Sequence, residues 1–127
     1  MAVVLDSSAL LALILREPGH ENVTPLLPGA LISTVNLAEI ISRLARTGWD
    51  TSIPLGIISR SAMSIVDLDR DQAVVTGRLV LSTMAYGLSL GDRACLALAQ
   101  ARGLGVLTAD RAWSRLPDMG IPIEMIR

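Results

Sequence analysis

Four acidic residues of this 127-residue chain stand beside short apolar segments or near the start of predicted helices: Asp6, Glu39, Asp92 and Asp110. Carboxylates within a few ångströms of one another repel, so a cluster of them takes up either a proton or a cation. Sites built only from oxygen ligands favour Mg²⁺ or Mn²⁺ over Zn²⁺. Such an ion lowers the pKa of a water molecule and stabilises negative charge in the transition state of phosphate-ester cleavage. If the fold brings these residues together, we therefore expect metal-assisted hydrolysis.

Three of these acids also have explanations that need no function. Asp6 follows the apolar segment "VVL" and could cap the helix after it, and Asp110 could cap the short turn "DRAWSRL". Ser89 and Asp92 form an S-x-x-D capping box. Asp92 nevertheless shares a helical face with apolar residues, and Gly91 beside it lets a ligand or another backbone approach closely. Both interpretations stay open for all three acids.

Glu39 is the acid whose role the sequence leaves most open. The apolar stripe of its helix lies on the opposite side and consists of Leu37, Ile40, Ile41 and Leu44. Periodicity predicts a surface position, with an i,i+4 ion pair to Arg43 that contributes roughly a few tenths of a kcal/mol. Glu39 remains a candidate because its helix starts at the carboxyl end of a predicted strand.

The apolar runs and their Gly or Pro stops predict an α/β fold. Strands are expected at 3–5, 30–33, 64–68, 105–108 and 121–126. Helices are expected at 8–16, 20–27, 34–47, 53–62, 89–102 and, after a cap at Asp69, up to residue 86. Strands that alternate with helices over short loops indicate a mostly parallel five-stranded sheet flanked by helices. Ligands bind beyond the carboxyl ends of such strands, where the acids are expected to meet.

Length and composition narrow the class of protein further. No repeat or linker interrupts residues 1–127, which predicts a single domain. No apolar run approaches the roughly 18–20 residues needed to span a bilayer, so no membrane association is expected. Lone Cys95 cannot form an intramolecular disulfide, and we expect a cytoplasmic location. The net charge is −1 and all 11 basic residues are Arg, which leaves local bidentate phosphate contacts as the route to nucleic acid.

Other kinds of site are disfavoured by spacing. Asp67, Asp69 and Asp71 alternate as in a calcium-binding loop but lack the glycine and the distal glutamate of that motif. His20 and Cys95 lie too far apart in sequence to indicate a zinc site. The chain has neither the G-x-x-x-x-G-K phosphate loop nor the G-x-S-x-G nucleophile elbow.

Four stretches of the chain, taken in order, resemble PIN-domain nucleases, and most closely the VapC toxins of bacterial toxin–antitoxin pairs. They are "VLDSSALLAL", "ISTVNLAEI", "LSLGDRACLALAQARG" and "VLTADRAW". The resemblance extends over essentially the whole chain. It implies a PIN-like fold and a Mg²⁺- or Mn²⁺-dependent endoribonuclease that cuts RNA, forms a homodimer and is held inactive by a cognate antitoxin.

By position in these motifs, the resemblance implies a catalytic, metal-binding pocket formed by Asp6, Glu39, Asp92 and Asp110. Asp6 and Asp92 would be the main ligands, and Asp110 would complete the shell or bind a second ion. Glu39 would bind or orient the attacking water. The hydroxyls of Ser8 and Thr108 would support the ligands or position water.

The number of ions is open between one and two. The family's fifth acid has no counterpart close to Asp110, because Arg111 and Trp113 occupy that neighbourhood and Asp118 lies further along the chain.

Contacts to substrate and partner also have candidates. Four arginines near the pocket in sequence could contact phosphates, with solvated surface positions as the alternative: Arg43, Arg46, Arg93 and Arg111. The apolar segments "ALLALIL" and "HENVTPLLPG" could expose a groove for a partner peptide, with core packing as the alternative.

Two other functions compete with the ribonuclease. One is a different α/β metal enzyme, such as a phosphatase with a strand-end Asp nucleophile, although that class usually carries a second Asp where Ser8 stands. The other is a PIN-like scaffold that has lost catalysis and acts by binding, which the presence of all four acids disfavours.

Overall fold

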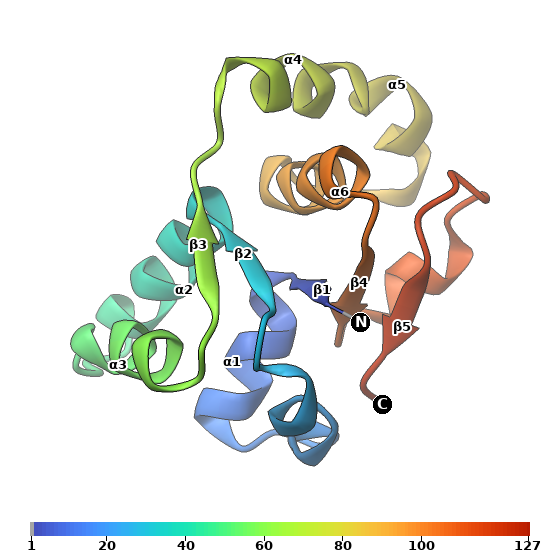
Figure 1. Ribbon diagram of the computed structural model, residues 1–127. Helices are drawn as coiled ribbons and strands as arrows, with labels where there is room; N and C mark the ends of the chain where they lie inside the picture. The colour runs from blue at the N-terminus through green and yellow to red at the C-terminus, as the bar shows by residue number, and fades with distance from the viewer. Residues whose placement is uncertain (1) are drawn as a thin grey trace.

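The computed structural model describes residues 2–127, in which five short apolar segments form one sheet with helices on both faces (Figure 1). The strands are β1 (Val3–Leu5), β2 (Leu31–Ser33), β3 (Ser64–Val66), β4 (Gly105–Thr108) and β5 (Ile123–Met125). Their order is β3-β2-β1-β4-β5, and each neighbouring pair is parallel. The predicted α/β class with a parallel five-stranded sheet is confirmed.

Alternate side chains of the strands build two cores, one on each face of the sheet. Leu5 belongs to a core shared with α1 (Ser7–Leu15), α2 (Thr34–Arg46) and α3 (Ser52–Arg60). Val4 belongs to the opposite core, which it shares with α6 (Leu90–Arg102) and with Trp113 of the 3-10 turn η4 (Arg111–Arg115).

The predicted helix over 20–27 is wrong. The structure has two short 3-10 turns there, η1 (His20–Asn22) and η2 (Thr24–Leu26). Pro25 lies in the second turn, and a proline has no N–H to donate to an α-helical hydrogen-bond ladder. These turns pack Val23 and Leu27 into the core beside α1, so "HENVTPLLPG" contributes to packing.

The predicted single helix up to residue 86 is also wrong. It divides into α4 (Arg70–Arg78), α5 (Val80–Thr83) and the 3-10 turn η3 (Met84–Tyr86). At the break, the Thr83 hydroxyl donates to the carbonyl of Leu79 at 2.7 Å. Hydroxyl groups that bond to the preceding turn compete with the backbone and bend helices.

The order of the strands creates a crevice at the carboxyl end of β1. The chain leaves β1 toward β2 on one side and later returns to β4 on the other side. At this switch point the Asp6 amide donates to the carbonyl of Leu107 at 3.2 Å, which holds the ends of β1 and β4 together. Such switch points are where open parallel sheets bind ligands.

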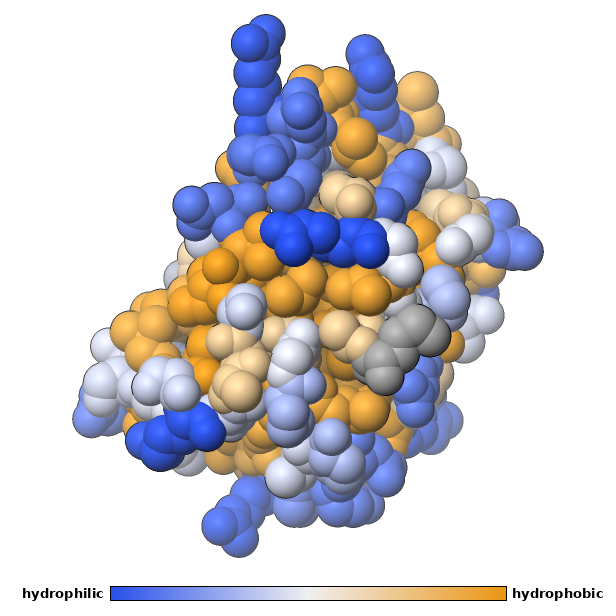
Figure 2. Space-filling view, viewed as in Figure 1, coloured by the Kyte–Doolittle hydropathy of each residue, from blue (hydrophilic) through white to orange (hydrophobic). Residues whose placement is uncertain are grey.

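The β3 edge of the sheet carries apolar surface. Ile65 on this edge strand is 40% exposed. Figure 2, viewed as in Figure 1, shows apolar surface across the middle of this face with hydrophilic side chains around it.

No helix within residues 2–127 combines the length and the hydropathy needed to cross a bilayer.

Candidate active site

A cavity of about 270 Å³ opens at the carboxyl ends of the strands. It is lined by residues from α1, α2, α6 and the loops after β1 and β4: Asp6, Ser7, Ser8, Leu11, Glu39, Arg43, Arg46, Asp92 and Asp110. All four acids that the sequence singled out are in this set, although they lie up to about a hundred residues apart in the chain. The switch point of the sheet therefore carries a concentration of carboxylates.

Asp6 both caps a helix and lies in the wall of the cavity. Its Oδ1 accepts hydrogen bonds from the Ala9 amide at 3.0 Å and the Ser8 hydroxyl at 2.7 Å, and its Oδ2 accepts from the Thr108 hydroxyl at 2.7 Å. The side chain is only 2% exposed. Burial raises the pKa of Asp6 to about 6, although the three hydrogen bonds oppose this and the charge of Asp92 adds to it.

The capping interpretation is also correct for Asp92 and Asp110. The Asp92 Oδ2 accepts from the Ser89 amide at 2.9 Å, and the Ser89 hydroxyl accepts from the Asp92 amide at 3.2 Å, completing the capping box. Asp110 accepts from the Ala112 amide at 2.9 Å. Burial raises the pKa of Asp92, opposed by the bonds to Ser89 and aided by repulsion from Asp110 and Glu39. Capping and clustering thus occur together.

Glu39 does not make the ion pair that periodicity predicted. The only ion pair within 4.0 Å in residues 2–127 joins His20 and Glu21. The Oε1 atom of Glu39 instead accepts from the Ser7 hydroxyl at 2.6 Å and from the Asn36 side-chain amide at 3.0 Å. These contacts hold the carboxylate of an otherwise exposed helical residue against the neighbouring helices.

Sequence reasoning missed Ser7 and Asn36 as parts of this site. From the sequence, Ser7 is only an alternative helix cap. Asn36 had one available signal, which is that it precedes Glu39 by three residues and therefore lies next to it on the helix surface. That Asn36 faces α6 and is almost fully buried could not be inferred from spacing.

A family model for the PIN domain matches residues 3–119 of this chain. The chain belongs to the PIN domain family. No curated protein matches it significantly in sequence. The fold of this PIN domain is shared by solved toxin–antitoxin structures, and VapBC2 from Rickettsia felis, bound to a promoter DNA fragment, aligns with a TM-score of 0.75 at 20% identity over 98% of each chain.

Two structures from Mycobacterium tuberculosis are also similar to this PIN domain. VapC20, a toxin that cleaves the sarcin–ricin loop, aligns with a TM-score of 0.74 and 13% identity, covering 91% of this chain and 96% of its own. VapBC-5 aligns with a TM-score of 0.60 and 26% identity, covering 99% and 98%. The aligned portions leave little of either relative unmatched.

Two of the four arginines predicted to contact phosphates line the acidic cavity of the PIN domain, and two do not. Arg43 and Arg46 line the acidic cavity. Arg93 is half-buried and donates to the carbonyl of Thr76 on α4 at 2.9 Å. Arg111 is exposed on η4 and is not part of the cavity wall. The first two are therefore the arginines best placed to meet a phosphate there.

Asp118 and Cys95 are not ligand candidates in the structure. The Asp118 carboxylate accepts from the Gly120 amide at 2.9 Å in an exposed turn and does not line the cavity. Cys95 is fully buried beneath the acids, and burial together with their charges raises the pKa of its thiol well above its ordinary value. This thiol is a packing group rather than a nucleophile or metal ligand.

The oxygen atoms in the cavity wall are suitable ligands for a divalent cation. Within residues 2–127, the groups in its wall that can ligate a metal are carboxylates and hydroxyls, with neither thiol nor imidazole, and this is a hard oxygen set beside the two guanidinium groups. The side chains of the same residues do not yet converge, since no three acidic, histidine or cysteine groups surround a common point. The chemistry therefore fits Mg²⁺ or Mn²⁺, and binding would have to draw the carboxylates together.

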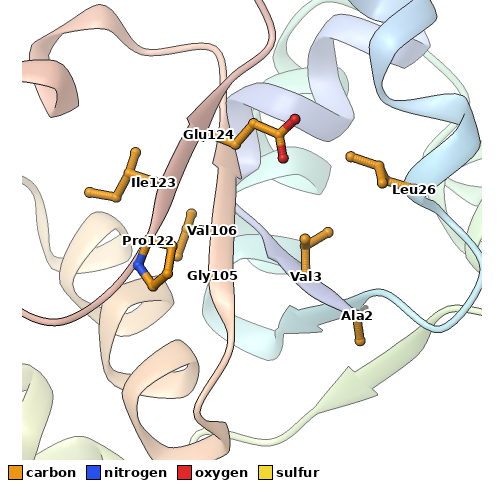
Figure 3. Close-up of a pocket in the computed structure, with 8 residues that line it drawn as sticks. All are labelled: Ala2, Val3, Leu26, Gly105, Val106, Pro122, Ile123 and Glu124. Atoms are coloured by element: carbon orange, nitrogen blue, oxygen red, sulfur yellow. The ribbon is translucent and has the colours of Figure 1, made fainter.

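A second cavity, of about 280 Å³, lies at the opposite, amino-terminal ends of the strands (Figure 3). Apolar side chains and backbone form most of its wall: Ala2, Val3, Leu26, Gly105, Val106, Pro122 and Ile123. Glu124 is the one carboxylate among the described residues that line it. A single carboxylate in a hydrocarbon hollow offers neither a cation site nor an acid–base pair, so we place the chemistry in the acidic cavity.

Proposed function

We propose that this PIN domain is a metal-dependent endoribonuclease that hydrolyses RNA phosphodiester bonds, and that it is the toxin of a VapBC-type toxin–antitoxin pair. The observation that carries the proposal is the meeting of four carboxylates from separate elements in one cavity at the switch point of the sheet. The name of the similar VapC20, a toxin that cleaves the sarcin–ricin loop, supports RNA as the substrate. We treat residues 1–127 as a single catalytic domain.

The cofactor in this proposal is one or two Mg²⁺ or Mn²⁺ ions. Asp6 and Asp92 would be the main ligands, and Asp110 would complete the set. When bound, the cation would lower the pKa of a water molecule and neutralise charge on the scissile phosphate. Asp6 is suited to its part because two hydroxyls and one amide hold both of its oxygens in fixed directions.

Glu39 would orient the attacking water. Its Oε1 is already occupied by the Ser7 and Asn36 donors, whereas its Oε2 accepts no hydrogen bond from residues 2–127. The open oxygen is the one that can accept a hydrogen bond from water in the cavity. Arg43 and Arg46, which line the same cavity, would bind phosphates of the RNA.

The same acidic cavity supports the proposed antitoxin partner. A cluster of carboxylates attracts basic side chains, so an antitoxin segment that carries one could neutralise the cavity and exclude RNA. The structural relatives named VapBC2 and VapBC-5 are toxin–antitoxin structures. A homodimer also belongs to the proposal, since Leu81 and Met84 are 81% and 67% exposed and large exposed apolar groups mark association surfaces.

The phosphatase alternative fits the site less well. In that chemistry the strand-end Asp attacks phosphorus and a second Asp two positions later serves as the acid–base partner. Here that position is Ser8, whose hydroxyl donates to the Asp6 Oδ1 at 2.7 Å. A hydroxyl that is tied to the strand-end Asp cannot serve as the acid–base carboxylate, so the site lacks one of the two groups that this chemistry needs.

The test is cleavage of total bacterial RNA, including folded tRNA and rRNA, by the purified protein in Mn²⁺, in Mg²⁺ and in EDTA. Asp6→Asn protein serves as the control, because asparagine keeps the helix cap and removes the charge. We expect discrete cuts that require the metal and are absent with the variant. Absence of cleavage by antitoxin-free protein that binds Mn²⁺ would contradict the proposal and favour the scaffold or phosphatase functions.

A further inference from the structure

Asn36 is the point where three helices meet beside the acidic cavity. It is only 1% exposed. Its side-chain Nδ2 lies 3.0 Å from the Glu39 Oε1, 3.2 Å from the Ser7 Oγ and 3.1 Å from the Gly91 carbonyl oxygen. These three acceptors belong to α2, α1 and α6. One buried amide group therefore links all the helices that carry the wall of the cavity.

The orientation of this amide is determined by its neighbours. The Gly91 carbonyl and the Glu39 carboxylate can only accept, so the NH₂ group must face them. Its own Oδ1 is then buried without a hydrogen-bond partner in the described structure. Leaving a buried oxygen unpaired is unfavourable, and an apolar residue of similar size would avoid it. Packing alone does not explain an asparagine at this position.

We propose that Asn36 is a positioning residue that holds the Glu39 carboxylate in the acidic cavity; this inference rests on the function proposed above. The amide and the Ser7 hydroxyl both donate to Oε1, which leaves Oε2 without a hydrogen bond from residues 2–127. The bond to the Gly91 carbonyl fixes the amide itself to α6. Without Asn36, the carboxylate of the exposed Glu39 would lose the buried donor that holds it beside α6.

The rival explanation is that Asn36 only pins α2 to α6. Two substitutions separate the roles, Asn36→Ala and the nearly isosteric Asn36→Leu, which keeps the packing and removes both donors. Asn22→Ala is the matched control, since the Asn22 amide also donates to a backbone carbonyl, that of Ile126 at 2.9 Å, away from the cavity. Each protein is measured for thermal stability, Mn²⁺ affinity without RNA, and kcat and KM for RNA cleavage.

A positioning role predicts a specific pattern in these measurements. Both Asn36 variants should lose about 10- to 100-fold in kcat, the range typical for residues that support a metal site from outside its ligands, with a KM for RNA within about twofold of wild type. Their Mn²⁺ affinity should fall by less than their kcat, because Glu39 reaches the cation only through the water that it orients, whereas Asn22→Ala should change neither quantity. In a Glu39→Gln background, Asn36→Ala should lower kcat by less than about twofold further, because the residue acts through Glu39.

Two results would overturn the inference. One is a loss of thermal stability alone, with kcat and Mn²⁺ affinity unchanged. The other is an equal loss of kcat with and without Glu39. A crystal structure of metal-free Asn36→Leu tests the positioning role independently of activity. In that structure the Glu39 carboxylate should no longer lie against Gly91. If wild-type protein neither binds Mn²⁺ nor cuts RNA, the proposed function fails, and an unmoved Glu39 in that crystal structure would reject the positioning role separately.

Discussion

The carboxylate of Glu39 lies directly against the α-carbon of Gly91, across the boundary between α2 and α6. A Cβ built on Gly91 would overlap both oxygens and the carboxyl carbon of Glu39. The backbone at Gly91 is ordinary helix, so this glycine is required by the space that Glu39 occupies and not by its torsion angles. Glu39 and Gly91 belong to two candidate site motifs about fifty residues apart, and the small size of one residue makes room for the carboxylate of the other.

Gly91→Ala should therefore displace Glu39 and lower kcat for RNA cleavage by at least about tenfold, because the carboxylate moves away from its donors. Gly77→Ala is the matched control, since Gly77 is also helical and a Cβ there meets nothing within 4 Å. The control should be active and more stable by about 0.5–1 kcal/mol, as expected for alanine in a helix. Equal activity of both variants and wild type would mean that Glu39 has no part in the reaction.

Asp92→Asn should abolish cleavage while leaving the thermal midpoint equal or higher. Asparagine can still accept from the Ser89 amide, so the capping box survives. Burial, together with repulsion from Asp110 and Glu39, raises the pKa of Asp92 in the native protein, and the substitution removes the charge that both effects disfavour. Differential scanning calorimetry measures the thermal midpoint, and an RNA cleavage assay measures the loss of activity. A large fall in the thermal midpoint would show that Asp92 acts as a structural cap above all.

The buried carboxyl of Asp6 should make the metal-free protein less stable as the pH rises. Its pKa is 3.8 in an ordinary environment and about 6 in the folded protein, so the folded state holds this proton more tightly than the unfolded chain does. The free energy of unfolding should therefore decrease between about pH 4 and pH 6 and level off above, by up to about 3 kcal/mol from this residue.

Asp6→Asn isolates that contribution. Urea unfolding in EDTA across pH 4 to 7.5 should show that wild type becomes less stable relative to the variant as the pH rises. Parallel curves for the two proteins would mean that Asp6 does not carry the shifted pKa.

Arg43 and Arg46 should contribute to RNA binding rather than to the chemical step. Replacing both with alanine should raise KM several-fold with little change in kcat. It should also reduce the slope of log KM against log salt by about 0.7 for each phosphate of single-stranded RNA that an arginine no longer neutralises. Arg102→Ala, in the last turn of α6 and absent from the cavity wall, is the control. An unchanged salt slope would remove both arginines from the substrate path.

The positions of the strand-end acids could be predicted because a parallel sheet brings its carboxyl ends to one edge. The pattern of strands was enough to place Asp6 and Asp110 at this edge, and the predicted start of its helix was enough to place Asp92 there. Glu39 could not be placed by the same means. Periodicity correctly made it exposed, but the approach of α1 and α6, which supply Ser7 and Gly91, is a tertiary property.

The errors in the fold arose where local chemistry overrides apolar periodicity. Pro25 and the Thr83 hydroxyl each interrupt a helical pattern that a count of apolar positions continues. Asn36 was missed because a polar residue on a helix is ordinarily solvated, and its burial depends on a carbonyl of α6 55 positions away. Both kinds of error concern hydrogen bonds, which hydrophobic patterns do not record.

The central claim is that the carboxylates at the switch point hold a divalent cation, and anomalous scattering from a Mn²⁺-soaked crystal tests it most directly. We expect an anomalous peak in the acidic cavity, bonded to Asp6 and to at least one of Asp92 and Asp110, and no peak there in Asp6→Asn crystals. A wild-type crystal in millimolar Mn²⁺ with an empty cavity, or with Mn²⁺ only at other carboxylates, would contradict the account.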